Sequence, residues 1–383
     1  MSTSDQDDGK RRIRLFKGLY LTPLQLVLAV AGILALFLVP EIEGVSTRLS
    51  LTTIHQGILW GMAAVGLNLL LRHTELVSFG HAAFFGAGAY GGAIVVNFLG
   101  VDAGLVVLFG GVTLALFFSL LIGWLVAEYR DIYFALLTLA FGQVLFAIAL
   151  GWGTLGQDEG LFLRAGGSFT GDPPTLFALE LGLRQYRILL YYLTIVLLVA
   201  SLLVMWRLIN SPFGNALDAI GQDRTRARFI GIPVKRYVWA AFVVSGVYGG
   251  IAGALYGMRR LQVTPEGTLE VFRSGEILFM AILGGFQTLL GPVIGGIVLR
   301  WLLENARFVT EHFELLTGLV LIFVVFFMPQ GILGSLPKIA AGTRKRARNP
   351  GMVGGDLSTL GTMFADAARD AARTIKILLF GVK

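Results

Sequence analysis

The chain has 383 residues, of which 55% are hydrophobic and only 14% are charged. Soluble domains carry about 25% charged residues, so this chain has too few charges to cover a water-exposed surface, and we predict an integral membrane protein. The chain contains no cysteine, which excludes disulfide bonds, thiol catalysis and cysteine-bound metal.

The net charge of +7 does not indicate a nucleic-acid partner, because the basic residues lie in short blocks between apolar segments. Such blocks orient membrane proteins, whose cytoplasmic loops are enriched in Lys and Arg. Residues 1–22 form a basic N-terminal segment, and the apolar segment 23–40 follows it. This segment ends at Pro40 without a small-residue cleavage site, so we expect an uncleaved first membrane helix.

A bilayer core of about 30 Å requires roughly 20 apolar residues per helix. Segments of this kind follow one another at 23–40, 51–71, 79–98, 104–127, 132–152, 186–206, 237–258 and 315–334. A longer apolar stretch is interrupted by Gly284-Gly285 and Gly291-Pro292, which divides it into two short spans, 276–290 and 292–308.

Charge distribution decides how many spans the chain has. With two short spans there are about ten helices, both termini share one side, and most Lys and Arg residues lie on that side. With a single span, Lys and Arg would divide almost evenly between the two sides. We therefore predict an all-α integral membrane protein with about ten membrane helices, some short or broken, and with both termini cytoplasmic.

The predicted membrane domain covers 23–336 and contains a cytoplasmic loop at 207–236. Residues 337–356 are rich in Gly, Asn, Pro and basic residues and are predicted to be a linker. In 357–383, apolar and charged residues alternate at helical spacing, which is typical of an amphipathic helix on the surface of membrane lipids. A weakly structured tail is an equal alternative.

The loop 207–236 carries helix boundary residues. Ser211 followed by Pro212 is a helix start, and Asp223 can cap a second short helix. Gly231 can end that helix, and Pro233 prevents its continuation. We predict two short cytoplasmic helices. Their apolar edge consists of Phe213, Leu217 and Ile220, and their basic edge consists of Arg224, Arg226 and Arg228.

An apolar helix edge of this kind can dock into the groove of a partner protein. The alternative is a basic loop that serves only to orient the protein, and periodicity alone favours this alternative.

Polar residues inside apolar spans are costly in lipid, so they should face the bundle interior or a water-filled path. The candidates for a solute pathway are Ser78, His81, Tyr90, Thr138 and Gln143. Each can instead form a hydrogen bond between helices. For His81 that structural role is the favoured interpretation.

The sequence contains no phosphate-binding Gly-x-x-x-x-Gly-Lys-Ser/Thr motif. Residues 86–91 match Gly-x-Gly-x-x-Gly, but they lie inside an apolar helix without a preceding strand. We interpret the glycines as packing residues instead, because Gly88 and Gly92, and also Gly249, Gly253 and Gly257, place small residues four apart on one helix face.

Several blocks resemble the branched-chain amino-acid ABC permease family, and most closely the M-type permeases of the Liv system. They include Leu76-Val-Ser-Phe-Gly-His-Ala-Ala-Phe-Phe-Gly-Ala-Gly-Ala-Tyr90 and Ile282-Leu-Gly-Gly-Phe-Gln-Thr-Leu-Leu-Gly-Pro292. Further blocks lie at 66–71, 133–143, 211–231, 252–256 and 327–334. Together they follow the family's order from 55 to 335.

The resemblance implies a transport subunit of a bacterial inner membrane, without cofactor, metal or catalytic residues of its own. Its implied partners are a second related permease, two cytoplasmic ATPase subunits and an extracytoplasmic substrate-binding protein. It also implies that the 211–231 segment contacts an ATPase subunit; the residues expected there are Phe213, Gly214, Leu217, Ile220, Arg224, Arg226 and Gly231.

The implied substrate is a branched-chain or related small amino acid. Permeases of the same family for urea, amides or other small solutes remain an alternative. An autonomous secondary transporter is the alternative from another class. It usually requires charge within the membrane, which the sequence does not clearly show.

Overall fold

A computed structural model describes residues 51–163, 175–176 and 182–309, together with 13–14, 20–21, 315, 318–319, 322 and 331–333. The predicted span 23–40 and the segments 337–356 and 357–383 lie outside these residues, as does most of the predicted span 315–334. Near the N-terminus, strands β1 (Ile13–Arg14) and β2 (Tyr20–Leu21) pair antiparallel.

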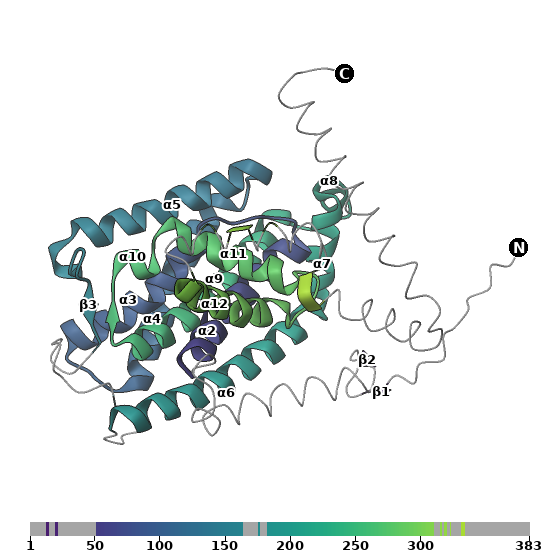
Figure 1. Ribbon diagram of the computed structural model, residues 1–383. Helices are drawn as coiled ribbons and strands as arrows, with labels where there is room; N and C mark the ends of the chain where they lie inside the picture. Colours follow the sequence, from purple (N-terminus) through teal and green to yellow (C-terminus); the bar gives the residue numbers. More distant parts are fainter. Residues whose placement is uncertain are drawn as a thin grey trace, which may run out of the picture. The chain divides into compact units, whose positions relative to one another are not determined.

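Long helices make up most of the described chain (Figure 1). Six of the described helices are long and apolar enough to cross a membrane: α2 (Leu51–His73), α3 (His81–Leu99), α4 (Gly104–Val126), α5 (Asp131–Gly151), α6 (Leu183–Ile209) and α9 (Val234–Arg260). Each corresponds to a predicted span. They confirm a helical protein with several membrane-type helices, whereas the total of ten and the cytoplasmic termini stay predictions.

The long apolar stretch after residue 276 forms two helices, α11 (Val271–Gly284) and α12 (Gly291–Val309). The interruption lies at the glycines that the sequence indicated: Gly285 has a positive φ of 108°, a conformation that glycine adopts without steric cost. With 14 residues, α11 is about 21 Å long, which is short of the bilayer core of about 30 Å.

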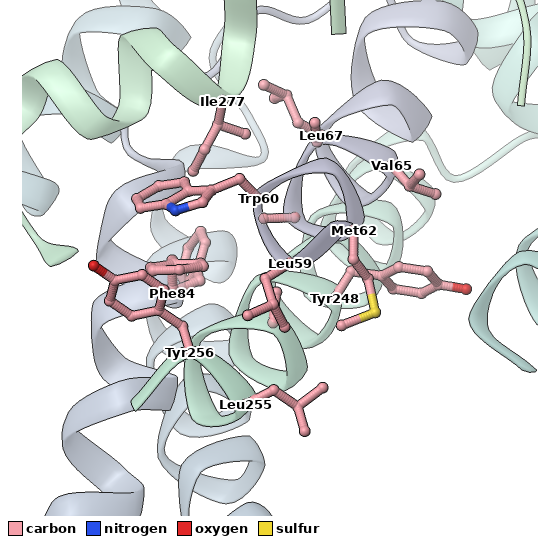
Figure 2. Packing of buried hydrophobic residues seen from close by; sticks show 14 of the residues in the cluster. Leu59, Trp60, Met62, Val65, Leu67, Phe84, Tyr248, Leu255, Tyr256 and Ile277 are labelled. Atoms are coloured by element: carbon pink, nitrogen blue, oxygen red, sulfur yellow. The ribbon is translucent and has the colours of Figure 1, made fainter. Parts of the chain in front are cut away.

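Helix α2 lies at the centre of the bundle. In the most apolar stretch of α2, 89% of the residues are buried inside the protein. The corresponding share is 28% for α4 and for α5, which lie at the periphery. Figure 2 shows the Trp60 indole of α2 beside Tyr256 of α9 and Ile277 of α11. The indole also stacks on Phe85 of α3, with ring centroids 4.1 Å apart. Large aromatic side chains therefore fill the junction of four helices.

Helices α3 and α9 approach each other backbone to backbone. A Cβ atom added to Gly88 would overlap the carbonyl of Gly250, and one added to Gly253 would overlap the carbonyl of Phe85. The predicted small-residue faces are therefore confirmed as packing surfaces.

Short elements complete the end of the bundle where α5 and α9 finish. They are η1 (Gly153–Leu155), β3 (Leu161–Phe162), β4 (Gln262–Val263) and α10 (Pro265–Thr268). Strands β3 and β4 pair antiparallel, with Leu161 opposite Val263.

Candidate functional site

The loop between α6 and α9 folds into the two predicted helices, α7 (Pro212–Gln222) and α8 (Arg224–Phe229). Ser211 Oγ accepts a hydrogen bond from the backbone N–H of Phe213 at 3.2 Å. The Asp223 carboxylate accepts from the N–H groups of Thr225 at 2.8 Å and Arg226 at 3.1 Å. The hydrogen bond from the N–H group of Arg226, followed by that from Thr225, lowers the pKa of the Asp223 carboxyl group. The ionised form of the cap is thereby favoured.

The apolar residues of α7 face the protein's own bundle. Leu217 and Ile220 are completely buried, and Phe213 stacks on Tyr237 of α9 with ring centroids 5.5 Å apart. A Cβ atom at Gly214 would overlap the backbone at the end of α6. In the structure this apolar edge fixes α7 to the membrane helices, while the contact with an ATPase subunit stays a prediction.

Two polar contacts also tie the loop to the bundle. His73 Nδ1, at the end of α2, lies 2.5 Å from Asp218 Oδ1 of α7. Arg224, which is only 9% exposed, donates from Nη1 to the carbonyl of Tyr129 at 3.0 Å, in the connection between α4 and α5. Movement of α7 and α8 would therefore be transmitted to several membrane helices.

The exposed apolar surface of the loop lies at the end of α8. Phe229 is 86% exposed and Ile230 is 74% exposed, and the exposed residues Arg226 and Arg228 precede them. Gly231, with a positive φ of 87°, ends this segment as predicted. The sequence analysis did not single out Phe229 and Ile230. An apolar pair at the end of an arginine-rich helix, directly before a terminating glycine, nevertheless indicates an exposed contact surface.

Ser78, His81 and Thr138 form hydrogen bonds that connect α3 and the turn before it to α5 and α9. His81 Nδ1 lies 2.9 Å from Ser78 Oγ, and His81 Nε2 lies 2.6 Å from Ser245 Oγ of α9. Thr138 Oγ1 of α5 accepts from the backbone N–H of Phe79 at 3.2 Å. These contacts pair the polar groups of three buried side chains, and whether these residues also line a solute pathway stays a prediction.

Tyr90 and Gln143, the other two pathway candidates, lie apart from this network. Gln143 is half-buried on α5. Tyr90 lines a cavity of about 270 Å³ between α3, α4 and α5. Its hydroxyl group is buried and has no hydrogen-bond partner among the described residues.

A partly buried ionic group lies between α11 and α12. Glu276 accepts from Arg300 at 2.7 Å and from Arg273 at 2.8 Å. The Arg300 guanidinium also lies 4.6 Å from the ring centroid of Trp60. The sequence analysis missed Arg300 because it treated 292–308 as a purely apolar span.

Comparisons with known proteins agree with this architecture. A family described as "branched-chain amino acid transport system / permease component" matches residues 49–325. The high-affinity branched-chain amino acid transport system permease protein LivM of Escherichia coli (strain K12) is 28% identical over 297 residues, which cover 70% of this chain and 66% of LivM. This chain therefore spans slightly less than two thirds of the length of that relative.

Two other relatives extend the comparison. The high-affinity branched-chain amino acid transport system permease protein LivH of the same strain is 26% identical over 294 residues, which cover 73% of this chain and 92% of LivH. The autoinducer 2 import system permease protein LsrC of Yersinia pseudotuberculosis is 26% identical over 227 residues, covering 57% of this chain and 62% of LsrC. No solved structure matches the chain. Because the family match covers most of its length, the chain belongs to the family of branched-chain amino acid transport permease components.

Proposed function

We propose that this chain is the membrane subunit of an ABC importer that carries branched-chain or related small aliphatic amino acids across a bacterial inner membrane. ATP hydrolysis takes place on separate cytoplasmic subunits. The observation that carries the proposal is the exposed apolar pair Phe229 and Ile230 at the end of a short helix that is fixed to the bundle. The names of the relatives support the substrate class.

The proposed coupling works through the rigidity of the 207–236 loop. Phe229 and Ile230 enter an apolar groove of an ATPase subunit, so that apolar side chains of a helical segment fill a partner's groove, as in helix-in-groove recognition. Closure of the ATPase subunits displaces α8 and α7. The Arg224–Tyr129 and His73–Asp218 contacts carry this displacement to the α4–α5 connection and to α2, which reorients the membrane helices.

The proposed assembly contains a second, related permease, two ATPase subunits and an extracytoplasmic binding protein that delivers the solute. The similarity to both LivM and LivH supports a pair of related permeases. Helices α4 and α5 expose large apolar side chains, among them Phe109, Phe117, Trp124 and Leu136. In the membrane this periphery contacts lipids or the second permease.

Two alternatives have an observation in their favour. LsrC is an autoinducer 2 permease by name, so another small solute is possible within this family. The buried Arg300–Glu276 pair places charge inside the bundle, which is a feature of autonomous secondary transporters. Both charged groups are paired here, however, so neither is free to bind a coupling ion.

Aspartate at positions 229 and 230 tests the coupling site. In the Phe229→Asp/Ile230→Asp variant we expect the affinity for the ATPase subunits to fall by about 2 kcal/mol or more, roughly thirtyfold, because central apolar contacts dominate such interfaces. Uptake by the assembled transporter should fall with it. Co-purification of the ATPase subunits and solute uptake in vesicles are the two measurements.

The matched control is Phe229→Leu, which keeps an apolar side chain at the same exposed position and should retain ATPase binding. Aspartate at Leu217 is unsuitable as a test, because that side chain is buried and its replacement would disturb the fold. Normal ATPase binding and uptake by the double aspartate variant would rule out the α8 end as the coupling site.

A further inference from the structure

A cavity of about 270 Å³ lies between the second half of α3, the middle of α4 and the end of α5. Its wall is formed mostly by aliphatic and aromatic side chains, including Leu145, Ala149 and Trp152. None of the described residues that line it is charged. An apolar group is therefore the guest that such a wall accommodates best.

Two polar groups limit what that guest can be. Thr154 lies at the end formed by η1, where Trp152 is 61% exposed, and Ile148 of α5 also lines the cavity and is 41% exposed. The cavity is therefore open at the η1 end and along α5. Tyr90 is only 4% exposed and its hydroxyl is without a partner in the described chain. A buried hydroxyl without a hydrogen bond is costly, and a guest with a hydrogen-bond acceptor would remove that cost, whereas a hydrocarbon chain would not.

The size of the cavity fits a small aliphatic amino acid. A six-carbon ring fills an engineered apolar cavity of about 150 Å³, so the nine non-hydrogen atoms of leucine need roughly 225 Å³. A cavity of about 270 Å³ holds one such molecule.

The open end faces the side from which a solute would arrive. If the 207–236 loop is cytoplasmic, α5 runs outward and Trp152 lies at the extracytoplasmic end of the cavity. A zwitterion whose carboxylate lies at Tyr90 would direct its ammonium group toward Thr154 and the open end, and would place its side chain against the apolar wall at Ala149.

We infer that this cavity is the subsite for the apolar side chain of the transported amino acid, and that the Tyr90 hydroxyl donates a hydrogen bond to the carboxylate of the solute. This inference rests on the proposed function and adds a location and a recognition chemistry to it. The absence of a lining charge makes binding weak, which suits a site from which the solute must leave again.

A photoreactive diazirine analogue of leucine tests the location in the complete transporter, with both permeases, the ATPase subunits and the binding protein reconstituted in vesicles. During turnover, we expect the analogue to label the segment 145–155, and excess leucine should prevent the labelling. In the Ala149→Phe variant, where a phenyl group fills the cavity, labelling and leucine uptake should both fall at least tenfold. ATP hydrolysis should persist, which a general folding defect would not allow.

A control variant and a second variant test whether the loss of uptake in Ala149→Phe has a cause other than the filled cavity. Ala147→Phe adds the same phenyl group to α5 at an exposed position that does not line the cavity, and it should retain uptake. Tyr90→Phe keeps the ring and removes only the hydroxyl group; we expect leucine uptake to fall about fivefold, as for the loss of one hydrogen bond. If Ala149→Phe fails to assemble, unchanged uptake by Tyr90→Phe overturns the inference.

Three further outcomes are decisive. Labelling elsewhere in the chain, or full leucine uptake by Ala149→Phe, contradicts the subsite while the proposed function stands. A phospholipid that co-purifies with the unaltered protein and is lost from Ala149→Phe, without loss of uptake, identifies the cavity as a lipid site and also overturns it. If the unaltered transporter carries no aliphatic amino acid, the proposed function fails and the subsite fails with it.

Discussion

The Glu276→Ala variant is expected to lose about 3–5 kcal/mol of stability, because it leaves a buried cation without its partner. The Arg300 side chain is only 14% exposed and donates to Glu276 Oε2 at 2.7 Å. Without the carboxylate, Arg300 keeps its position over the Trp60 ring, 4.6 Å from the centroid, which contributes about 2 kcal/mol at most, and the electrostatic attraction of Glu304. The fraction of detergent-solubilised protein that remains monodisperse on heating measures the loss.

Two variants isolate the cause of this loss. Arg273→Ala removes the other, more exposed guanidinium and leaves the Glu276–Arg300 pair intact, so we expect a much smaller effect. The double variant Glu276→Leu/Arg300→Leu removes both charges and should regain most of the stability, because apolar replacement of a buried ion pair is often neutral. Wild-type stability of Glu276→Ala would show that the pair is not a structural requirement.

The Gly253→Ala variant is expected to destabilise the bundle by about 1–3 kcal/mol, since overpacking forces neighbouring atoms to move. The added methyl group would overlap the Phe85 carbonyl, and that carbonyl belongs to the backbone of α3 and cannot rotate away. Separation of α3 from α9 would also disturb the nearby Trp60–Phe85 stack. Thermal stability of the purified variant is the measurement.

Gly275→Ala is the matched control. It makes the same change within helix α11, but there the nearest atom to the new Cβ is Phe279 Cε2, at 4.0 Å. Alanine favours helix over glycine by about 1 kcal/mol, so this variant should be as stable as the unaltered protein or more stable. Equal stability of the Gly253→Ala and Gly275→Ala variants would contradict the close packing of α3 and α9.

Local chemistry predicted the boundaries of the loop helices well. Ser211 and Asp223 accept backbone N–H groups at the starts of α7 and α8, and such capping depends only on residues within one helical turn. The interruption between α11 and α12 was predictable for the same reason, because consecutive glycines and a proline break a helix locally.

Tertiary contacts were less accessible from the sequence. Periodicity identified Leu217 and Ile220 as one apolar face of α7, but it could not tell whether that face meets the protein's own bundle or a partner. In the structure α7 packs against α2, α6 and α9, whereas Phe229 and Ile230 at the end of α8 are exposed. The division between internal and external contacts depends on how helices distant in sequence are arranged.

The Glu276–Arg300 ion pair depends on a tertiary contact, but part of that contact can be predicted from the local break between α11 and α12. Arg300 alone looks like an isolated charge in an apolar span. Once α11 and α12 are recognised as two antiparallel helices, however, Glu276 and Arg300 lie at similar distances from the connecting turn, and this symmetry predicts their contact. The unpartnered hydroxyl of Tyr90 has no comparable pattern, because its environment depends on α4 and α5 as well as on its own helix.

Uptake of radiolabelled leucine into vesicles tests the central claim most directly. Vesicles that contain the complete transporter, with ATP at the ATPase subunits and binding protein on the opposite side, should accumulate leucine. Vesicles that contain this chain alone, or with its partner permease but without ATPase subunits, should not. Accumulation by the chain alone, driven by a proton or sodium gradient, would contradict an ATP-driven permease and establish a secondary transporter.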